Sequence, residues 1–190
     1  MSRDRDYPDE PAGPFESPPL EFEDREGREI EIRAYDGSDE EYEALASMYQ
    51  EFDPADRAQG IPPSEDHRIT EWLDNILCAE CLNVIAWDGA TAAGHATLVP
   101  ERDASELAIF VLQAYQEAGI GTHLMKALLG YGAENGVEKV WLTVERWNNP
   151  AVGLYKKIGF EVCDAESFEL EMSIRLDGGS GAEKGEREGG

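Results

Sequence analysis

The sequence predicts an α/β fold in which one mixed β-sheet carries helices on both faces. Short apolar or alternating runs typical of strands recur along the chain, and longer stretches with helical spacing interrupt them. The predicted order is strand, two helices, three strands, helix, strand, helix and strand. With 190 residues the chain can enclose one such domain, which we expect over residues 28–176.

The first half of this domain is predicted from alternation and capping. Residues 29–33 alternate polar and apolar side chains, as a half-buried strand does. Ser38 precedes an acidic turn and an apolar stripe, a pattern typical of a helix N-terminus. A second helix is indicated by helical spacing at Ile69, Trp72, Leu73, Ile76 and Leu77. Strands over 82–87 and 91–99 then flank Asp88-Gly89, a hairpin signal.

The second half is predicted from apolar runs separated by glycine. A strand over 107–112 leads through Gly119 into a helix that Gly136 ends. The remaining strand, short helix and last strand are expected at 140–144, 150–157 and 168–174.

Both ends of the chain lack the pattern of a packed element. Residues 1–27 hold five of the ten prolines without sustained periodicity, and we expect them to form a disordered acidic arm. Residues 177–190 are rich in glycine and charge, and we expect a disordered tail. The sequence shows neither the apolar core of a signal peptide nor a membrane-spanning run, so a cytoplasmic protein without membrane contact is expected.

The chain is strongly acidic, with 41 Asp and Glu against 16 Lys and Arg, of which five are lysines. This balance argues against nucleic acid as a partner, because nucleic acid binds basic patches. Since the acidic residues are spread along the chain, they predict a protein adapted to very high salt, where screening shortens to about 3 Å at 1 M. The alternative is an acidic surface that binds a basic partner.

Cys78 and Cys81 have the spacing of a redox or metal-binding pair. Zinc would need two further ligands, and the sequence places none beside them. We therefore expect two small buried residues at a helix-to-strand junction and no metal site.

The segment from Phe110 to Thr122 predicts an anion site. A strand passes through a short loop directly into a helix, with Gly119 and Gly121 at the junction. The first amides of a helix have no partner within it, and the helix dipole is positive at this end, so phosphate is favoured there. Glycine also lets a ligand approach the backbone. A glycine pair that only caps the helix is the alternative.

A second motif lies downstream, after a further strand. The pattern Gln116-x-x-Gly119-x-Gly121 is followed by Asn148-x-x-Ala151-x-x-x-Tyr155-x-x-x-Gly159-Phe160. Together the two motifs resemble those of the GNAT superfamily of N-acyltransferases, over residues 105–165. The resemblance implies a GNAT-like fold, acetyl-CoA as co-substrate, no metal, and direct acetyl transfer to an amine acceptor.

The resemblance also implies residue roles. The backbone of Phe110 and Val111 would face the acetyl and pantetheine groups, the Asn148 side chain would bond the pantetheine arm, and Tyr155 would protonate the departing thiolate. The loop that cradles the pyrophosphate would comprise Gln116, Glu117, Ala118, Gly119, Ile120, Gly121 and Thr122. Because residues 115–125 contain no Lys or Arg, we expect uncharged amides to bind the cofactor.

The general base is left open. Relatives use a glutamate five residues before the motif asparagine, but this chain has Thr143 there. Glu106 is the first candidate for the base, and the others are Glu145, His95 and His123.

Two other functions are weighed against acetyl transfer. One is a dinucleotide-binding oxidoreductase, although Leu124 stands where that fingerprint has Gly or Ala. The other is a non-catalytic acyl-CoA sensor. The acceptor is unidentified, and the protein is expected to be a monomer or homodimer.

Overall fold

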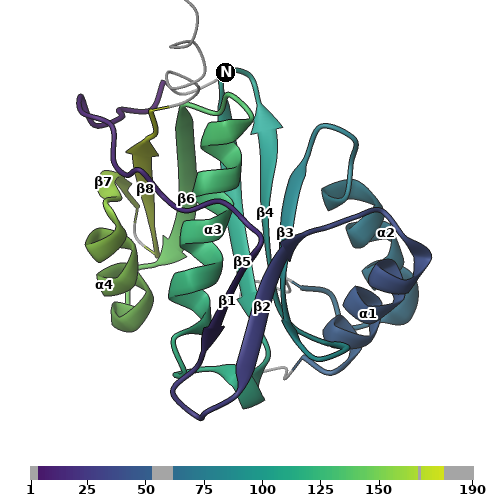
Figure 1. Ribbon diagram of the computed structural model, residues 1–190. Helices are drawn as coiled ribbons and strands as arrows, with labels where there is room; N and C mark the ends of the chain where they lie inside the picture. Colours follow the sequence, from purple (N-terminus) through teal and green to yellow (C-terminus); the bar gives the residue numbers. More distant parts are fainter. Residues whose placement is uncertain (1–3, 53–61, 167, 178–190) are drawn as a thin grey trace, which may run out of the picture.

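The computed structural model describes residues 4–52, 62–166 and 168–177. The described elements are, in chain order, β1 (Leu20–Glu23), β2 (Glu29–Ala34), α1 (Asp39–Gln50), α2 (Asp66–Ile76), β3 (Leu82–Asp88), β4 (Thr91–Glu101), β5 (Ala104–Val111), η2 (Gln113–Tyr115), α3 (Ile120–Glu134), β6 (Lys139–Glu145), α4 (Asn149–Ile158), β7 (Glu161–Ala165) and β8 (Glu169–Arg175). The strands form one sheet in the order β1-β2-β3-β4-β5-β6-β8-β7 (Figure 1). The predicted α/β class with a mixed sheet is confirmed, and β1, β7 and η2 are additional to the predicted order.

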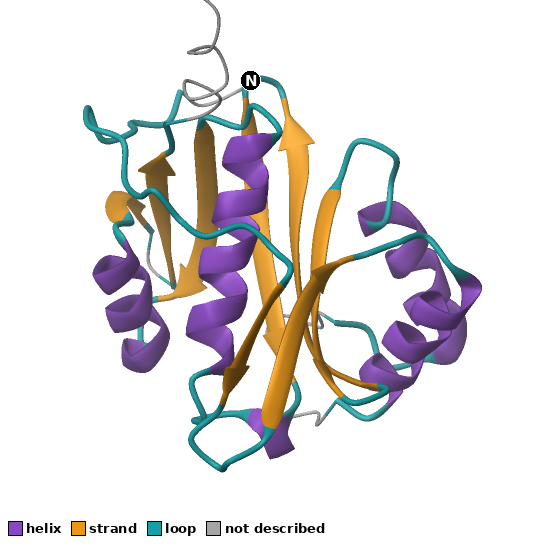
Figure 2. Ribbon diagram, in the orientation of Figure 1, coloured by secondary structure: helices purple, strands orange, loops and turns teal. Residues whose placement is uncertain are grey.

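Strand alternation divides the interior into two cores, one on each face of the sheet. In β3, Val84 and Ala86 belong to the core that contains α3, whereas Ile85 and Trp87 belong to the core under α1 and α2. Residues of α4 pack with the first core. We call the two sides the α3 face and the α1 face; Figure 2 shows α3 lying across the sheet and α1 and α2 beside it.

Helix ends form where local chemistry satisfies free backbone groups. The Ser38 side chain accepts the Glu41 N–H at 3.2 Å and begins α1, as predicted. Gly119 precedes α3 in a left-handed conformation, with φ of 91°. Beyond the other end of α3, Gly136 also has a positive φ, of 84°, a conformation that glycine adopts without a steric penalty.

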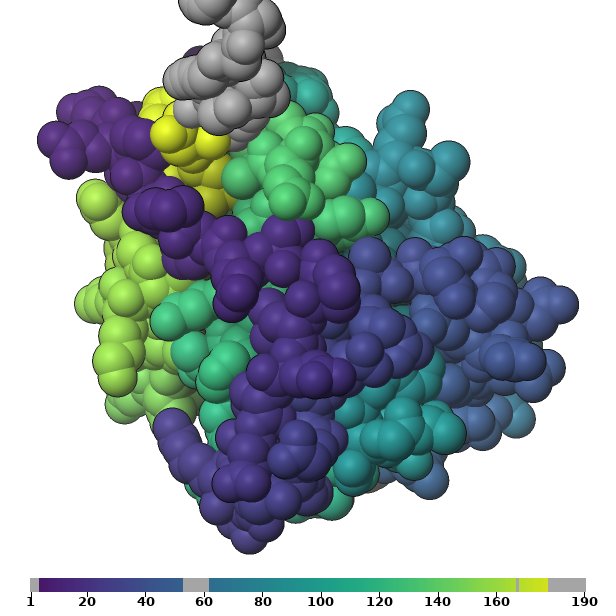
Figure 3. All heavy atoms as spheres, in the orientation of Figure 1, coloured from purple at the N-terminus to yellow at the C-terminus, as the bar shows by residue number. Residues whose placement is uncertain are grey.

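The N-terminal segment differs from the mobile arm expected of residues 1–27. Residues 4–27 pack on the domain: β1 pairs with β2, and Ala12 bridges to Leu176. The backbone of Phe15 crosses α3 at Gly130, where a Cβ would lie 2.7 Å from the Phe15 carbonyl oxygen. Figure 3 shows this segment in purple across the surface. The expectation failed because separate anchors on the domain, rather than a periodic pattern, hold the segment. The tail at 178–190 lies outside the described residues.

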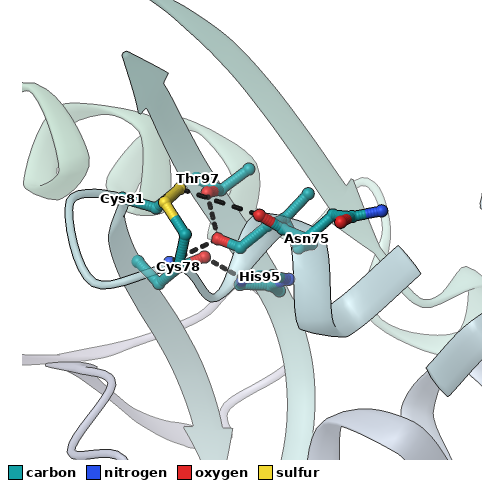
Figure 4. Close-up of a disulfide and its surroundings, with 7 residues drawn as sticks. Asn75, Cys78, Cys81, His95 and Thr97 are labelled. Atoms are coloured by element: carbon teal, nitrogen blue, oxygen red, sulfur yellow. Dashed lines mark hydrogen bonds between the residues drawn. A yellow bond between two sulfur atoms is a disulfide. The ribbon is translucent and has the colours of Figure 1, made fainter. Parts of the chain in front are cut away.

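The Cys78–Cys81 pair also differs from expectation. The two residues form a disulfide just after α2 (Figure 4). Cys78 is exposed and Cys81 is buried, so the prediction of two small buried residues was wrong for Cys78. Within the described residues, no group of three or more His, Cys, Asp or Glu is placed to hold a metal ion. None of the helices described has the length and apolar character required to cross a membrane.

Candidate active site

The site is organised by two parallel strands that separate. β5 and β6 pair only at Ser105 with Val140 and at Glu106 with Trp141, yet both strands continue beyond these pairs. The later part of β5 therefore has an edge that is not paired with β6. Because the strands are parallel, their carboxyl ends point the same way, so the loop into α3 and the loop into α4 follow the same end of the sheet (Figure 1).

The strand register identifies which backbone groups face this edge. The Leu112 N–H donates to the Ala93 carbonyl oxygen at 3.0 Å. Hydrogen-bonded pairs alternate along an antiparallel ladder, so Phe110 is paired with His95 on β4. The backbone groups of Ile109 and Val111 then point toward β6. The resemblance implied that the backbone groups of Phe110 and Val111 face the acetyl and pantetheine groups. In the structure, the backbone groups that face the unpaired edge are those of Ile109 and Val111.

The loop before α3 presents free amides. The first helical bond joins the His123 N–H to the Gly119 carbonyl at 3.3 Å, so the amides of residues 120–122 have no acceptor within the helix. A Cβ built on Gly121 would meet only Val111 Cγ2, at 3.9 Å, which leaves the space outside this turn open. Gln116 Nε2 donates to the Val111 carbonyl at 3.0 Å and ties the loop to the end of β5.

Two arginines that the sequence analysis missed lie against this loop. The Arg25 N–H donates to the Ala118 carbonyl at 3.0 Å, and its guanidinium donates to the Glu117 carbonyl at 3.4 Å. The Arg28 guanidinium donates to the Ala114 carbonyl at 3.2 Å. The sequence has no Lys or Arg within residues 115–125, and the structure adds these two cations from outside that range. No local signal could have shown this, because the arginines come from the turn after β1.

The second motif lies at the start of α4. Asn148 caps this helix by accepting the Ala151 N–H on Oδ1 at 3.3 Å, which leaves its amide NH2 group as the part it could offer to a ligand. Tyr155 is half-buried, and none of the described residues hydrogen-bonds its hydroxyl group. Burial raises the pKa of Tyr155 to about 12, so this group is protonated at neutral pH and is able to act as an acid.

The four candidates for the base have different surroundings. Burial, together with Glu101 and Glu171, raises the pKa of Glu106, whose side chain is accessible on the α1 face, although Arg5 acts in the opposite direction. Glu145 lies opposite Glu169 in the sheet.

The two histidines are both engaged in contacts within the protein. His95 is fully buried, and its ring nitrogens bond the Tyr49 hydroxyl at 2.6 Å and Asn83 Oδ1 at 2.7 Å. His123 stacks on Phe22 with centroids 3.8 Å apart, and its Nδ1 donates to the Gly119 carbonyl. These contacts favour the two carboxylates over the histidines as the base.

Comparison with known proteins identifies the family. The Acetyltransferase (GNAT) family matches residues 43–160, more than half of the chain. The chain belongs to the GNAT family. This GNAT protein is 43% identical to the N-alpha-acetyltransferase of Sulfurisphaera tokodaii over 56 aligned residues. The aligned stretch covers 29% of this chain and 34% of that protein. It is 32% identical to an uncharacterized N-acetyltransferase of Mycobacterium bovis over 79 aligned residues. This stretch covers 40% of this chain and 51% of that protein. The chain thus spans between a third and about half of these relatives' lengths.

Solved structures show the same fold. The GNAT domain of S. lividans PAT matches with a TM-score of 0.68 and 16% identity, over 83% of this chain and 97% of that one. The PaiA N-acetyltransferase of Thermoplasma acidophilum, solved in complex with coenzyme A, matches with a TM-score of 0.60 and 19% identity, over 76% of this chain and 99% of that one.

Family membership places this GNAT protein among acetyltransferases. It does not favour the oxidoreductase alternative, and neither does Leu124, which is fully buried in the core where that fingerprint needs a small residue.

Proposed function

We propose that this GNAT protein transfers the acetyl group of acetyl-CoA directly to a primary amine. One observation carries the proposal: the free amides at the start of α3 and the Asn148–Tyr155 segment of α4 both follow the end of the sheet where β5 loses its pairing with β6. One end of the sheet thus offers an anion site, an unpaired strand edge and a protonated acid.

The donor would be held mainly by the backbone. The amides of residues 120–122 would bind the pyrophosphate, with Arg25 adding a positive charge beside them. The pantetheine arm would lie along the unpaired edge at Ile109 and Val111 as an added strand, and the Asn148 amide would donate to it. A side chain larger than alanine at position 121 would extend into the space through which the pyrophosphate would approach these amides.

The reaction would need a neutral amine and a protonated leaving group. Glu106, through a chain of water molecules along the α1 face, would take a proton from the amine, whose nitrogen then attacks the thioester carbon. Tyr155 would give its proton to the departing thiolate. The one free cysteine of the described residues, Cys163, lies outside both motifs and bonds the Glu171 carbonyl, which supports direct transfer rather than a covalent acyl-enzyme.

The names of relatives support an amine acceptor. The relative from Sulfurisphaera tokodaii is an N-alpha-acetyltransferase, and a relative from Mus musculus, 34% identical over 70 residues, is a thialysine N-epsilon-acetyltransferase. Both names describe transfer to nitrogen.

The test is release of free thiol from acetyl-CoA in the presence of a panel of amines, with mass spectrometry of the amine. We expect thiol release that depends on an amine and yields an N-acetyl product. Binding of acetyl-CoA without any product across the panel would instead favour the non-catalytic sensor.

A further inference from the structure

Residues 4–8, which we call the N-terminal strap, cross the α1 face where helices do not cover it. α1 and α2 pack over β3, β4 and the end of β5, and leave β6 and β8 open on this side. Alternate residues of β8 hold the strap: Arg5 Nε donates to Glu171 at 2.8 Å, the Ser173 hydroxyl donates to the Asp6 carbonyl at 2.7 Å, and Arg175 Nε donates to the Pro8 carbonyl at 2.7 Å.

Arg5 occupies a site suited to a cation, formed by Trp141 and Glu171, which we call the seat. Its guanidinium carbon lies 3.4 Å from the centroid of the Trp141 ring, and the Glu171 carboxylate neutralises its charge. An aromatic face and a carboxylate together are what recognises an ammonium or guanidinium group. Trp141 is 7% exposed, so its contact with Arg5 is almost fully shielded from water.

The seat lies on the α1 face of the sheet, from which an amine acceptor would reach the bound acetyl-CoA. The amides that would bind the cofactor belong to α3, so the acceptor would approach from the α1 face. Trp141 is the register partner of Glu106, and the two side chains therefore share that face. Phe110 lies four residues further along β5, about 13 Å at the rise of a strand. Glu145 and Glu169, which face each other in the register, add negative charge along this path.

We propose that Arg5 fills the subsite for a second cation of the acceptor, and that the strap gives way when the acceptor binds. The acceptor class is then an elongated diamine, with one nitrogen on Trp141 and Glu171 and the reacting nitrogen about 13 Å away. This inference rests on the proposed function for the direction of approach.

The test measures binding by calorimetry, without acetyl-CoA and at one fixed salt concentration. The probes are 1,10-diaminodecane, whose extended length matches the path, and 1,10-decanediol, which has the same length and carries no charge. Arg5→Ala should bind the diamine about fivefold more tightly than wild type and the uncharged diol equally well. Glu171→Gln should lose the preference for the diamine. Arg68→Ala, an exposed arginine on α2 paired with Glu65, is the matched control and should behave as wild type.

Because no turnover is measured, the result is readable even if acetyl transfer fails. Equal or weaker diamine binding by Arg5→Ala, or an unchanged preference in Glu171→Gln, would show that Arg5 only anchors the strap and would overturn the proposal. Thermal unfolding of each variant checks that the fold is retained, so that weaker binding is not caused by unfolding.

Discussion

The guanidinium of Arg25 donates to the carbonyl oxygen of Glu117 at 3.4 Å, and so places a positive charge from the turn after β1 on the loop that precedes α3. A Cβ built on Gly119 would lie 3.9 Å from Arg25 Nε. In a chain with a net charge of −25, Arg25 adds one positive charge directly beside the loop. The N-terminal segment therefore contributes to the candidate site as well as to packing.

Arg25→Ala should raise the KM for acetyl-CoA about threefold to tenfold at low ionic strength, because a charge near the polyanionic donor is lost. The effect should shrink as KCl approaches about 2 M, where the screening length is below about 3 Å. Steady-state kinetics at several salt concentrations check this, with Arg68→Ala as control. Equal KM values for wild type and Arg25→Ala at low salt would remove Arg25 from the site.

Tyr155→Phe should lower kcat about 100-fold while the KM for acetyl-CoA barely changes, since only the proton for the leaving thiolate is lost. The burial that raises the pKa of Tyr155 to about 12 keeps the acid form present throughout the neutral range. Single-turnover rates with one amine acceptor measure the effect. An unchanged kcat would exclude Tyr155 from the mechanism.

His95 should make stability depend on pH. Burial lowers the pKa of this histidine from 6.5 to about 3, so the unfolded chain binds a proton that the folded chain does not. Stability is therefore complete above pH 6.5 and falls as the pH drops, by about 1.4 kcal/mol per pH unit. Urea unfolding between pH 6.5 and about 5 measures this slope before most carboxylates titrate. His95→Gln should flatten it, and an equal slope in the variant would assign the effect to other groups.

Local sequence patterns were sufficient to predict much of the fold. Alternation, helical spacing and capping residues such as Ser38 act within one element, and the elements they predicted are present. The structure adds β1, β7 and η2, which these patterns did not predict. The N-terminal segment was missed because its anchors are single contacts to distant residues, as between Arg5 and Glu171.

The site was predictable where the chemistry is local. The turn at Gly119 and Gly121 and the cap at Asn148 follow from neighbouring residues. Arg25 was missed because it reaches the loop from another strand pair, and Ile109 because its orientation depends on the register of β4 and β5. The disulfide was missed because the spacing of Cys78 and Cys81 permits either a bond or free thiols.

The most direct test of the central claim compares wild type with Gly121→Val for acetyl-CoA-dependent acetylation of an amine, counting thiol released and N-acetyl product formed. Gly121→Ala, whose Cβ would meet Val111 at an ordinary 3.9 Å, controls for the fold. The account predicts equal amounts of thiol and N-acetyl amine from wild type, and acetyl-CoA binding at least about tenfold weaker in Gly121→Val. Wild-type affinity for acetyl-CoA in a folded Gly121→Val protein would contradict it.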